Sequence, residues 1–217
     1  MSSKQKQVEM AKILNKIDAI KFGLFTLSGG KVSPYYVDLR IVPSFPDVFC
    51  DICGFYIRTI TKEIGLKNFD RIAGIPVAGI PFASQVAYNL KKPFLYVLKG
   101  VKLHGRERRV EGVLASGDRV LLIDDLVTTG LTLKEAVDAV RAEGGVVSEA
   151  VAFIDREEGG KEMMEKSGVK LHSILKISEV AKALYDLGAL DDESMKTIQT
   201  QINSSKIGAK TKKLATK

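Results

Sequence analysis

The stretch VLLIDDLVTTGLT, residues 120–132, decides the fold of this chain. Its first four residues are apolar and predict a buried parallel strand, and the apolar periodicity of residues 133–141 predicts the helix that follows. Asp124 and Asp125 are therefore expected at the carboxyl end of a strand. In open α/β sheets, ligands bind at that edge.

The residues after this strand have the chemistry of a phosphate and sugar site. Thr128, Thr129 and Gly130 precede a helix N-terminus, where successive backbone N–H groups, hydroxyls and the helix dipole favour a phosphate. Asp124 and Asp125 can only accept hydrogen bonds when ionised, which suits the vicinal hydroxyls of a ribose or a hydrated Mg²⁺. The alternative is that the acids merely cap the helix, which would explain one of them but not two.

Strands and helices alternate outward from this stretch, which predicts a doubly wound parallel sheet of the α/β class. Ahead of it, a helix over residues 5–19 and a hairpin of strands 22–27 and 35–39 predict a small N-terminal hood within residues 1–45. A helix over residues 46–64 should follow. The other expected strands are 71–74, 94–98, 119–123, 146–154 and 169–175, and the other expected helices are 80–89, 177–187 and 192–202.

Composition favours one intracellular domain over residues 1–205, followed by a basic tail at 206–217. The length of 217 residues suits a single α/β core. No apolar run approaches the roughly 20 residues that span a bilayer, and the N-terminus lacks the apolar segment of a signal peptide. We therefore expect a cytoplasmic protein with no membrane partner.

The net charge of +7 is concentrated in two segments. The tail has five lysines and no acidic residue, and residues 99–109 have five lysines and arginines and one glutamate. The rest of the chain has no excess of positive charge, so a diffuse nucleic-acid-binding face is not expected. We expect the tail to be a solvated, mobile terminus, with binding of a polyanion as the alternative.

A long polar segment, residues 98–113, connects two expected strands and predicts a flexible loop over the site. Long loops without their own structure in compact domains are commonly lids or binding loops. Lys99, Lys102 and His104 could close over a polyanion and neutralise a leaving group while excluding water. The alternative is a solvated basic loop without a role in binding.

The motif at residues 120–132 resembles the signature of the type I phosphoribosyltransferases. The resemblance implies that family's fold and a loop that binds the ribose and 5-phosphate of phosphoribosyl pyrophosphate (PRPP). The implied PRPP-binding residues are Lys99, Lys102, His104, Asp124, Asp125, Leu126, Val127, Thr128, Thr129, Gly130, Leu131 and Thr132.

Three further segments resemble the orotate phosphoribosyltransferases within that family. The two lysines, the His-Gly and the Glu-Gly of LKGVKLHGRERRVEG match the family's loop. FGLFTLSGGKVSPYYVDLR, residues 22–40, and FIDREEGG, residues 153–160, are similar to the segments that frame the base. The resemblance implies that Arg156 and Thr128 contact orotate. An ion pair of Arg156 with Glu157 or Glu158 is the alternative.

The resemblance implies transfer of the 5-phosphoribosyl group of PRPP to orotate, giving orotidine 5'-monophosphate and pyrophosphate in pyrimidine biosynthesis. The implied catalytic residues are Lys99, Lys102, His104, Asp124 and Asp125. Of these, His104 could pass a proton to pyrophosphate. Mg²⁺ would be the cofactor, held by Asp124 and Asp125 indirectly, through PRPP or water. A homodimer with shared active sites is also implied. The alternatives are a phosphoribosyltransferase for another base and a PRPP-sensing regulator with the same fold.

The chain departs from the family at three positions that carry cations in many bacterial members. Ser28, Ala78 and Leu98 are neutral. The pyrophosphate end of the site is therefore expected to be weaker or to be built differently. Backbone N–H groups of residues 77–80, a larger share of charge on Mg²⁺, or Lys31 could each compensate.

Overall fold

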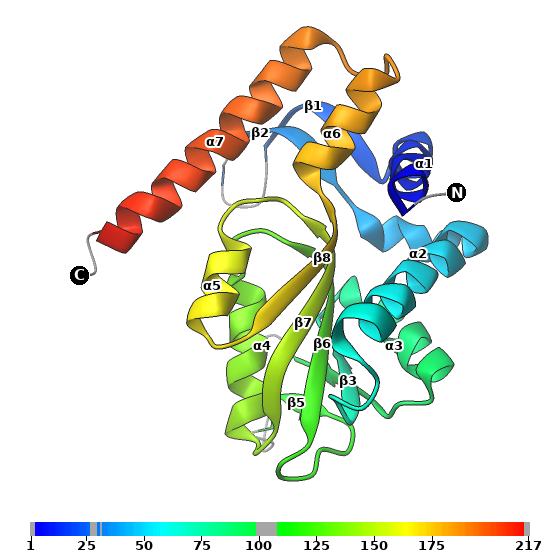
Figure 1. Cartoon of the computed structure of the whole chain (residues 1–217), viewed down its shortest axis with the longest axis vertical. Helices are drawn as coiled ribbons and strands as arrows, with labels where there is room; N and C mark the ends of the chain where they lie inside the picture. Colours follow the sequence, from blue (N-terminus) through cyan, green and yellow to red (C-terminus); the bar gives the residue numbers. More distant parts are fainter. Residues whose placement is uncertain (1–2, 27–29, 31, 99–107, 215–217) are drawn as a thin grey trace.

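The computed structural model describes residues 3–26, 30, 32–98 and 108–214, with only the backbone of 3, 4, 6 and 205–214. A six-stranded sheet lies at its centre (Figure 1), in the order β5-β4-β3-β6-β7-β8. The strands are β3 (Arg71–Gly74), β4 (Phe94–Val97), β5 (Val110–Glu111), β6 (Arg119–Val127), β7 (Val146–Asp155) and β8 (Lys170–Lys176).

Five of these strands are parallel, which confirms the predicted doubly wound sheet. The exception is the edge strand β5, which pairs with β4 in the antiparallel direction. No strand was expected at β5, because its two residues fall in the polar segment 98–113 that predicts a flexible loop. Two residues within a polar segment are too few to show the alternation that predicts a strand.

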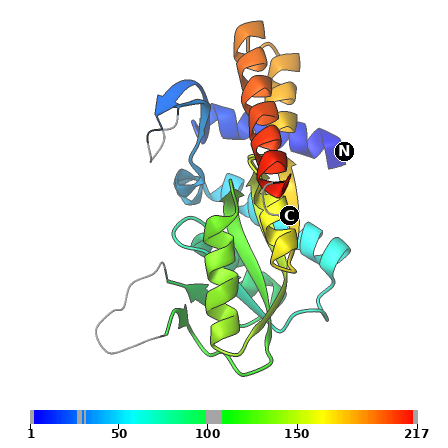
Figure 2. The same ribbon diagram turned by 90° about the vertical axis from the view of Figure 1, so that its left-hand side faces the viewer.

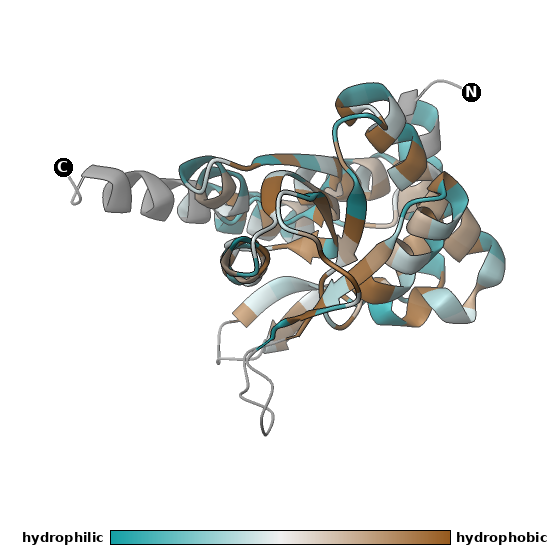
Figure 3. Ribbon diagram, turned by 90° about the horizontal axis from the view of Figure 1, so that it is seen from below, coloured by the Kyte–Doolittle hydropathy of each residue, from teal (hydrophilic) through white to brown (hydrophobic). Residues whose placement is uncertain are grey.

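Helices cover both faces of the sheet. On one face lie α2 (Pro46–Thr59), which continues into a π-helical turn η2 (Ile60–Ile64), and α3 (Gly79–Leu90); on the other lie α4 (Leu131–Ala142) and α5 (Gly160–Lys166). Successive side chains of a strand point to opposite faces, so Leu121 and Ile123 of β6 join one core cluster while Leu122 joins the other. The central strands are accordingly mostly hydrophobic, whereas the helices are mixed (Figure 3).

The N-terminal hood has the predicted helix and hairpin. It consists of α1 (Ser3–Lys16), β1 (Ile20–Thr26), β2 (Val32–Val37) and a 3-10 helix η1 (Leu39–Ser44). The closing helices α6 (Ile177–Asp186) and α7 (Asp192–Leu214) lie at the same end of the molecule, where α1 packs on α6 and α7 contacts β2 (Figure 2). The hood therefore stands over the carboxyl ends of the parallel strands.

The last helix is longer than predicted. We expected it to end at Ile202, but α7 continues to Leu214 and so takes in most of the basic segment at 206–217 (Figure 1). Lysine and alanine are good helix formers, and the segment has no proline to interrupt the helix. Within the described residues, no helix is both long and apolar enough to cross a membrane.

Candidate active site

The strand order creates a crevice between the carboxyl ends of β3 and β6. From β3 the chain moves outward to β4, and it then returns to the other side of β3 to form β6. The connections therefore leave these neighbouring strands in opposite directions, and such switch points are where open α/β sheets bind ligands. A cavity of about 360 Å³ lies here, lined by residues 37–40, 76–78, 124–128 and 130–133.

Asp124 and Asp125 lie within β6 and not after it. The strand was expected to end at Ile123, but its pairing with β7 continues to Val127. The Tyr56 hydroxyl donates a hydrogen bond of 2.6 Å to the backbone oxygen of Asp124. Because both acids are part of a hydrogen-bonded strand, their backbone is held by the sheet before any ligand arrives.

Gly79 allows the first turn of α3 to approach Asp124 closely. A Cβ atom at Gly79 would lie 2.8 Å from the Ile123 oxygen and 3.0 Å from the Asp124 Cα. Both neighbours are backbone atoms of the central sheet, which cannot move aside cheaply. Glycine at this position therefore brings residues 76–78 and the two acids to the same cavity.

Burial sets the electrostatics of the acidic pair. Only 6% of Asp124 is exposed, and its Oδ1 accepts a 3.0 Å hydrogen bond from the Asp125 backbone N–H. Desolvation raises the pKa of Asp125 above its ordinary value, and the nearby charge of Asp38 acts in the same direction. The negative charge of this wall is thus costly to the protein alone and favours a ligand that supplies hydrogen-bond donors or positive charge.

The predicted phosphate loop connects β6 to α4. Gly130 has φ +81°, in the left-handed region that glycine adopts readily, and it precedes the first residue of α4. The cavity is lined by Gly130 together with Leu126, Val127, Thr128, Leu131 and Thr132. The exposed Thr129 belongs to the same loop but does not line the cavity.

The start of α5 packs directly on this loop. A Cβ atom at Gly160 would lie 2.8 Å from the Thr128 oxygen, and one at Gly130 would lie 3.0 Å from the Gly160 oxygen. The two segments approach so closely because both positions are glycine. This contact gives a physical reason for the final glycine of the FIDREEGG string.

The hood supplies one wall of the cavity, with two charged residues that the family resemblance of residues 22–40 did not single out. Asp38 and Arg40, which follow β2, line it together with Val37 and Leu39. The Arg40 Nε and Nη2 atoms each donate a 2.7 Å hydrogen bond to the Asp38 carboxylate, which lowers the pKa of Asp38. The available signal was the pair of opposite charges two residues apart, at the end of the strand expected over residues 35–39.

Arg156 is buried in an ion pair and does not line the cavity. Its Nη2 lies 2.9 Å from Glu158 Oε1, and both side chains are less than a tenth exposed. The guanidinium also lies over the Tyr35 ring, 4.7 Å from its centroid, and within 3.4 Å of the Ser33 hydroxyl oxygen. The alternative raised for Arg156, an ion pair with Glu158, is therefore present, and its contact with orotate stays a prediction.

The comparisons with known proteins agree on one family. Residues 49–183 match the family model described as "Phosphoribosyl transferase domain". The orotate phosphoribosyltransferase of Cenarchaeum symbiosum is 40% identical over 86% of this chain and 93% of its own length. The chain belongs to the orotate phosphoribosyltransferase family. It is accordingly an enzyme of the glycosyltransferase type.

Two further members of the family support the assignment. The orotate phosphoribosyltransferase of Staphylothermus marinus is 39% identical over 95% of this chain and 99% of its own length. The crystal structure of the Aeropyrum pernix orotate phosphoribosyltransferase aligns with a TM-score of 0.74 and 30% identity, covering 84% of this chain and 99% of that one. The similarity therefore extends over nearly the whole of both relatives.

The family resemblance also assigned a catalytic loop, most of which lies outside the described residues. The undescribed part of this loop includes Lys99, Lys102 and His104. Two residues between the strands of the hood hairpin, Ser28 and Lys31, also lie outside the described residues. The ends of the loop are described: the Leu98 N–H donates to the Arg109 oxygen at 2.8 Å. The Glu143 carboxylate accepts hydrogen bonds from the N–H groups of Arg109 and Val110. Both ends are therefore attached to the core beside β4.

Proposed function

We propose that this chain transfers the 5-phosphoribosyl group of PRPP to N1 of orotate, producing orotidine 5'-monophosphate and pyrophosphate for pyrimidine biosynthesis. The observation that carries the proposal is the cavity at the β3–β6 switch point of a family member. Two adjacent acids line it, beside the loop and helix N-terminus at residues 128–132. This set of groups suits a molecule that carries phosphate at one end of a ribose.

The reaction breaks the bond between C1' of the ribose and the pyrophosphate oxygen, forms a bond from C1' to orotate N1, and releases the N1 proton. Positive charge develops on the ribose while negative charge leaves with pyrophosphate, so the enzyme must stabilise both. We assign the ribose hydroxyls to Asp124 and Asp125, whose carboxylates accept hydrogen bonds. The 5-phosphate is assigned to residues 126–132, where backbone N–H groups begin α4.

Mg²⁺ is the proposed cofactor, and the donor set suits it. Asp124 and Asp125 bring carboxylate oxygens to the cavity, and oxygen is the ligand atom that Mg²⁺ prefers. Within the described residues, no group of three or more acidic, histidine or cysteine side chains is arranged to hold a metal by itself. We therefore assign Asp124 and Asp125 to indirect contacts, through PRPP or water; bound Mg²⁺ would neutralise phosphate charge.

The leaving group is assigned to Lys99, Lys102 and His104, which would close over the cavity, with His104 able to pass a proton to pyrophosphate. We further propose a homodimer in which this loop completes the partner's site. A mixing experiment tests that arrangement. Two inactive variants, Lys102→Ala and Asp124→Asn, should recover activity when combined, because a mixed dimer would contain one intact site. Lack of recovery in a proven mixed dimer would contradict shared sites.

Orotate is assigned to Arg156 and Thr128. A guanidinium can donate two hydrogen bonds to a carboxylate, and the bound base would compete with Glu158 for Arg156. The variant Arg156→Ala should raise the KM for orotate far more than the KM for PRPP. If both KM values rise equally, Arg156 supports the fold and does not select the base.

The deciding assay is the loss of orotate absorbance when PRPP is added, with and without Mg²⁺. Turnover that requires Mg²⁺ supports the assignment, and uracil and adenine serve as competing bases. Turnover of another base in preference to orotate would identify a different phosphoribosyltransferase. Binding of PRPP without turnover of any base would identify a regulator with the same fold. We expect the reaction to take place in the cytoplasm.

A further inference from the structure

Arg40 is the one cationic side chain among the described residues that line the cavity. The other charged groups there are Asp38, Asp124 and Asp125. PRPP is itself highly anionic, so three carboxylates without a cation would oppose its entry. The described wall of the site therefore has a single guanidinium with which to attract and hold the substrate.

The Asp38 carboxylate fixes the orientation of this guanidinium. Asp38 accepts 2.7 Å hydrogen bonds from the Nε and Nη2 atoms of Arg40, and its Oδ1 also accepts from the Arg40 backbone N–H at 3.1 Å. The Tyr36 hydroxyl lies 2.9 Å from Nη2. These contacts engage the edge of the guanidinium formed by Nε and Nη2. The third nitrogen, Nη1, lies on the other side of the group.

The arginine of this pair remains open to solvent in spite of these contacts. Arg40 keeps 60% of its side chain exposed, so a ligand in the cavity can reach it without displacing a packed side chain. A guanidinium held at one edge loses little further conformational freedom when it binds an anion, which increases the affinity that its hydrogen bonds can provide.

Ala78 occupies a cavity position that carries a cation in many bacterial members of the family. It lines the same cavity, at the turn between β3 and α3, but it provides no charge. The 5-phosphate already has a loop and helix N-terminus at residues 128–132. The diphosphate, which carries more negative charge, has no such cation from residues 76–78.

We propose that Arg40 binds the diphosphate group of PRPP through the free edge of its guanidinium, and that Asp38 is a positioning residue for it. The proposal rests on the proposed function, because it assigns Arg40 to one part of that substrate. It also provides a cation on the hood that compensates for the neutral residues at family positions 28, 78 and 98.

Binding of inorganic pyrophosphate to the whole enzyme tests the proposal, measured by calorimetry beside steady-state kinetics. Arg40→Gln should raise the pyrophosphate Kd and the KM for PRPP by about ten- to a hundredfold, the range expected for losing charge-assisted hydrogen bonds. The KM for orotate and the affinity for ribose 5-phosphate should stay unchanged. The pyrophosphate Kd and the KM for PRPP of Arg40→Lys should lie between those of the wild type and Arg40→Gln, because lysine keeps the charge but not the planar fork.

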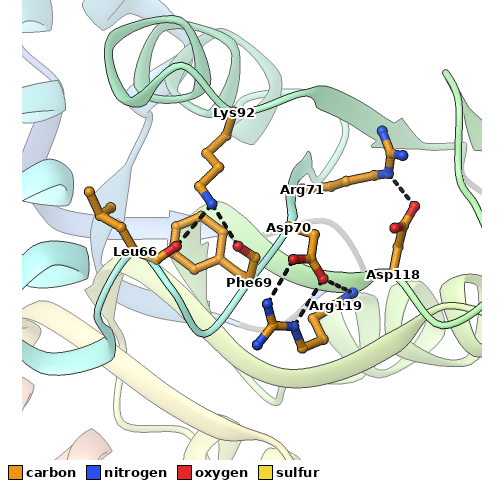
Figure 4. Close-up of polar contacts among 7 residues, drawn as sticks. All are labelled: Leu66, Phe69, Asp70, Arg71, Lys92, Asp118 and Arg119. Atoms are coloured by element: carbon orange, nitrogen blue, oxygen red, sulfur yellow. Dashed lines mark hydrogen bonds and ion pairs between the residues drawn. The ribbon is translucent and has the colours of Figure 1, made fainter.

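Arg119→Gln is the matched control. Arg119 is also an exposed arginine held by an aspartate through Nε and Nη2, but its partner is Asp70 at the opposite end of the sheet (Figure 4). Its loss should leave pyrophosphate binding unchanged. If Arg40→Gln leaves pyrophosphate binding and the KM for PRPP unchanged, or weakens only ribose 5-phosphate, the proposal is wrong.

Asp38→Asn separates positioning from binding. Asparagine cannot hold the guanidinium by two ionic hydrogen bonds, so the KM for PRPP should rise, less than in Arg40→Gln, with kcat at saturating PRPP retained. An effect on kcat alone would contradict the positioning role. Failure of the wild-type enzyme to consume orotate would instead refute the proposed function, and pyrophosphate binding would still report on Arg40.

Discussion

The amino ends of β3 and β6 carry two arginine–aspartate pairs, whereas near the carboxyl ends of the same strands β6 contains two adjacent aspartates that line a cavity. At the amino ends, Asp70 pairs with Arg119, and Arg71 with Asp118 (Figure 4). Each pair joins a residue at the start of one strand to a residue at the start of the other. The two ends of the same pair of strands therefore distribute charge in opposite ways.

The two ends differ in the direction in which the pKa values of their carboxyl groups are shifted. The hydrogen bonds from Arg119 and Arg71 hold the pKa values of Asp70 and Asp118 below their ordinary range. Burial raises the pKa of Asp125 at the other end. Ionised acids thus stabilise the fold where arginines meet them and destabilise it where a ligand is expected, a compromise between stability and activity.

The largest expected effect is on catalysis at the carboxyl end. Asp124→Asn should lower kcat/KM for PRPP by about 10²–10³-fold, because it removes negative charge where positive charge develops in the transition state. The melting temperature should not fall, since the amide is nearly the same size. Steady-state kinetics and calorimetry measure the two quantities. Nearly full activity would show that the acid at position 124 is structural, like those at the amino end.

The next effect tests the close approach of α3 to β6. Gly79→Ala should destabilise the protein by about 1–3 kcal/mol, because the added methyl group would meet the backbone of Ile123 and Asp124. Gly54→Ala in α2 is the control: its Cβ would meet only the end of the Arg58 side chain, at 3.3 Å. That change should be neutral or stabilising, since alanine favours a helix over glycine. Chemical denaturation compares the two variants, and an equal loss in both would contradict the packing argument.

A smaller effect should appear in the pH dependence of the carboxyl end. The pKa of Asp125 is higher in the folded than in the unfolded protein, so ionisation of Asp125 costs stability. The cost is absent below the unfolded pKa of about 3.9 and complete above the folded pKa. Asp125→Asn should therefore raise the melting temperature at neutral pH, and this gain should shrink as the pH falls toward about 4. A lower melting temperature at neutral pH would contradict the argument.

The amino end should show the opposite sign. The pKa of Asp118 is lower in the folded protein, so its contribution to stability is present above the unfolded pKa, about 3.9, and is lost as the pH falls through the folded pKa. Asp118→Asn should lower the melting temperature at neutral pH, with no difference from wild type at strongly acidic pH. Melting curves across pH for both asparagine variants measure the contrast directly. Equal signs at positions 118 and 125 would remove the distinction between the two ends.

Sequence patterns predicted the central sheet well, because its strands are continuous apolar runs with helices of clear periodicity between them. Arg71–Gly74 matches its predicted bounds, and the other parallel strands differ by a few residues at their ends. β6 was predicted too short for a physical reason. Polar residues normally end a buried strand, but here hydrogen bonds to β7 carry the backbone through Asp124 and Asp125 as far as Val127.

The candidate site was predicted only in part. Asp124, Asp125 and the loop after them follow one another in the chain, so local spacing was enough to identify them. Asp38 and Arg40 come from the hood, more than 80 residues earlier in the chain. The family resemblance placed residues 22–40 around the base, but no local pattern showed that these two side chains would line the same cavity as the acidic pair.

The sequence by itself determined the parallel sheet, the family motifs and the acidic pair followed by a phosphate loop, because each depends on residues near one another in the chain. Only the tertiary structure decided that β6 continues through the acids, that Arg156 pairs with Glu158, and that the hood brings Arg40 to the cavity. The physical reason is that burial, ion pairing and cavity shape arise between distant segments. Their free energies depend on the packed fold and not on local propensity.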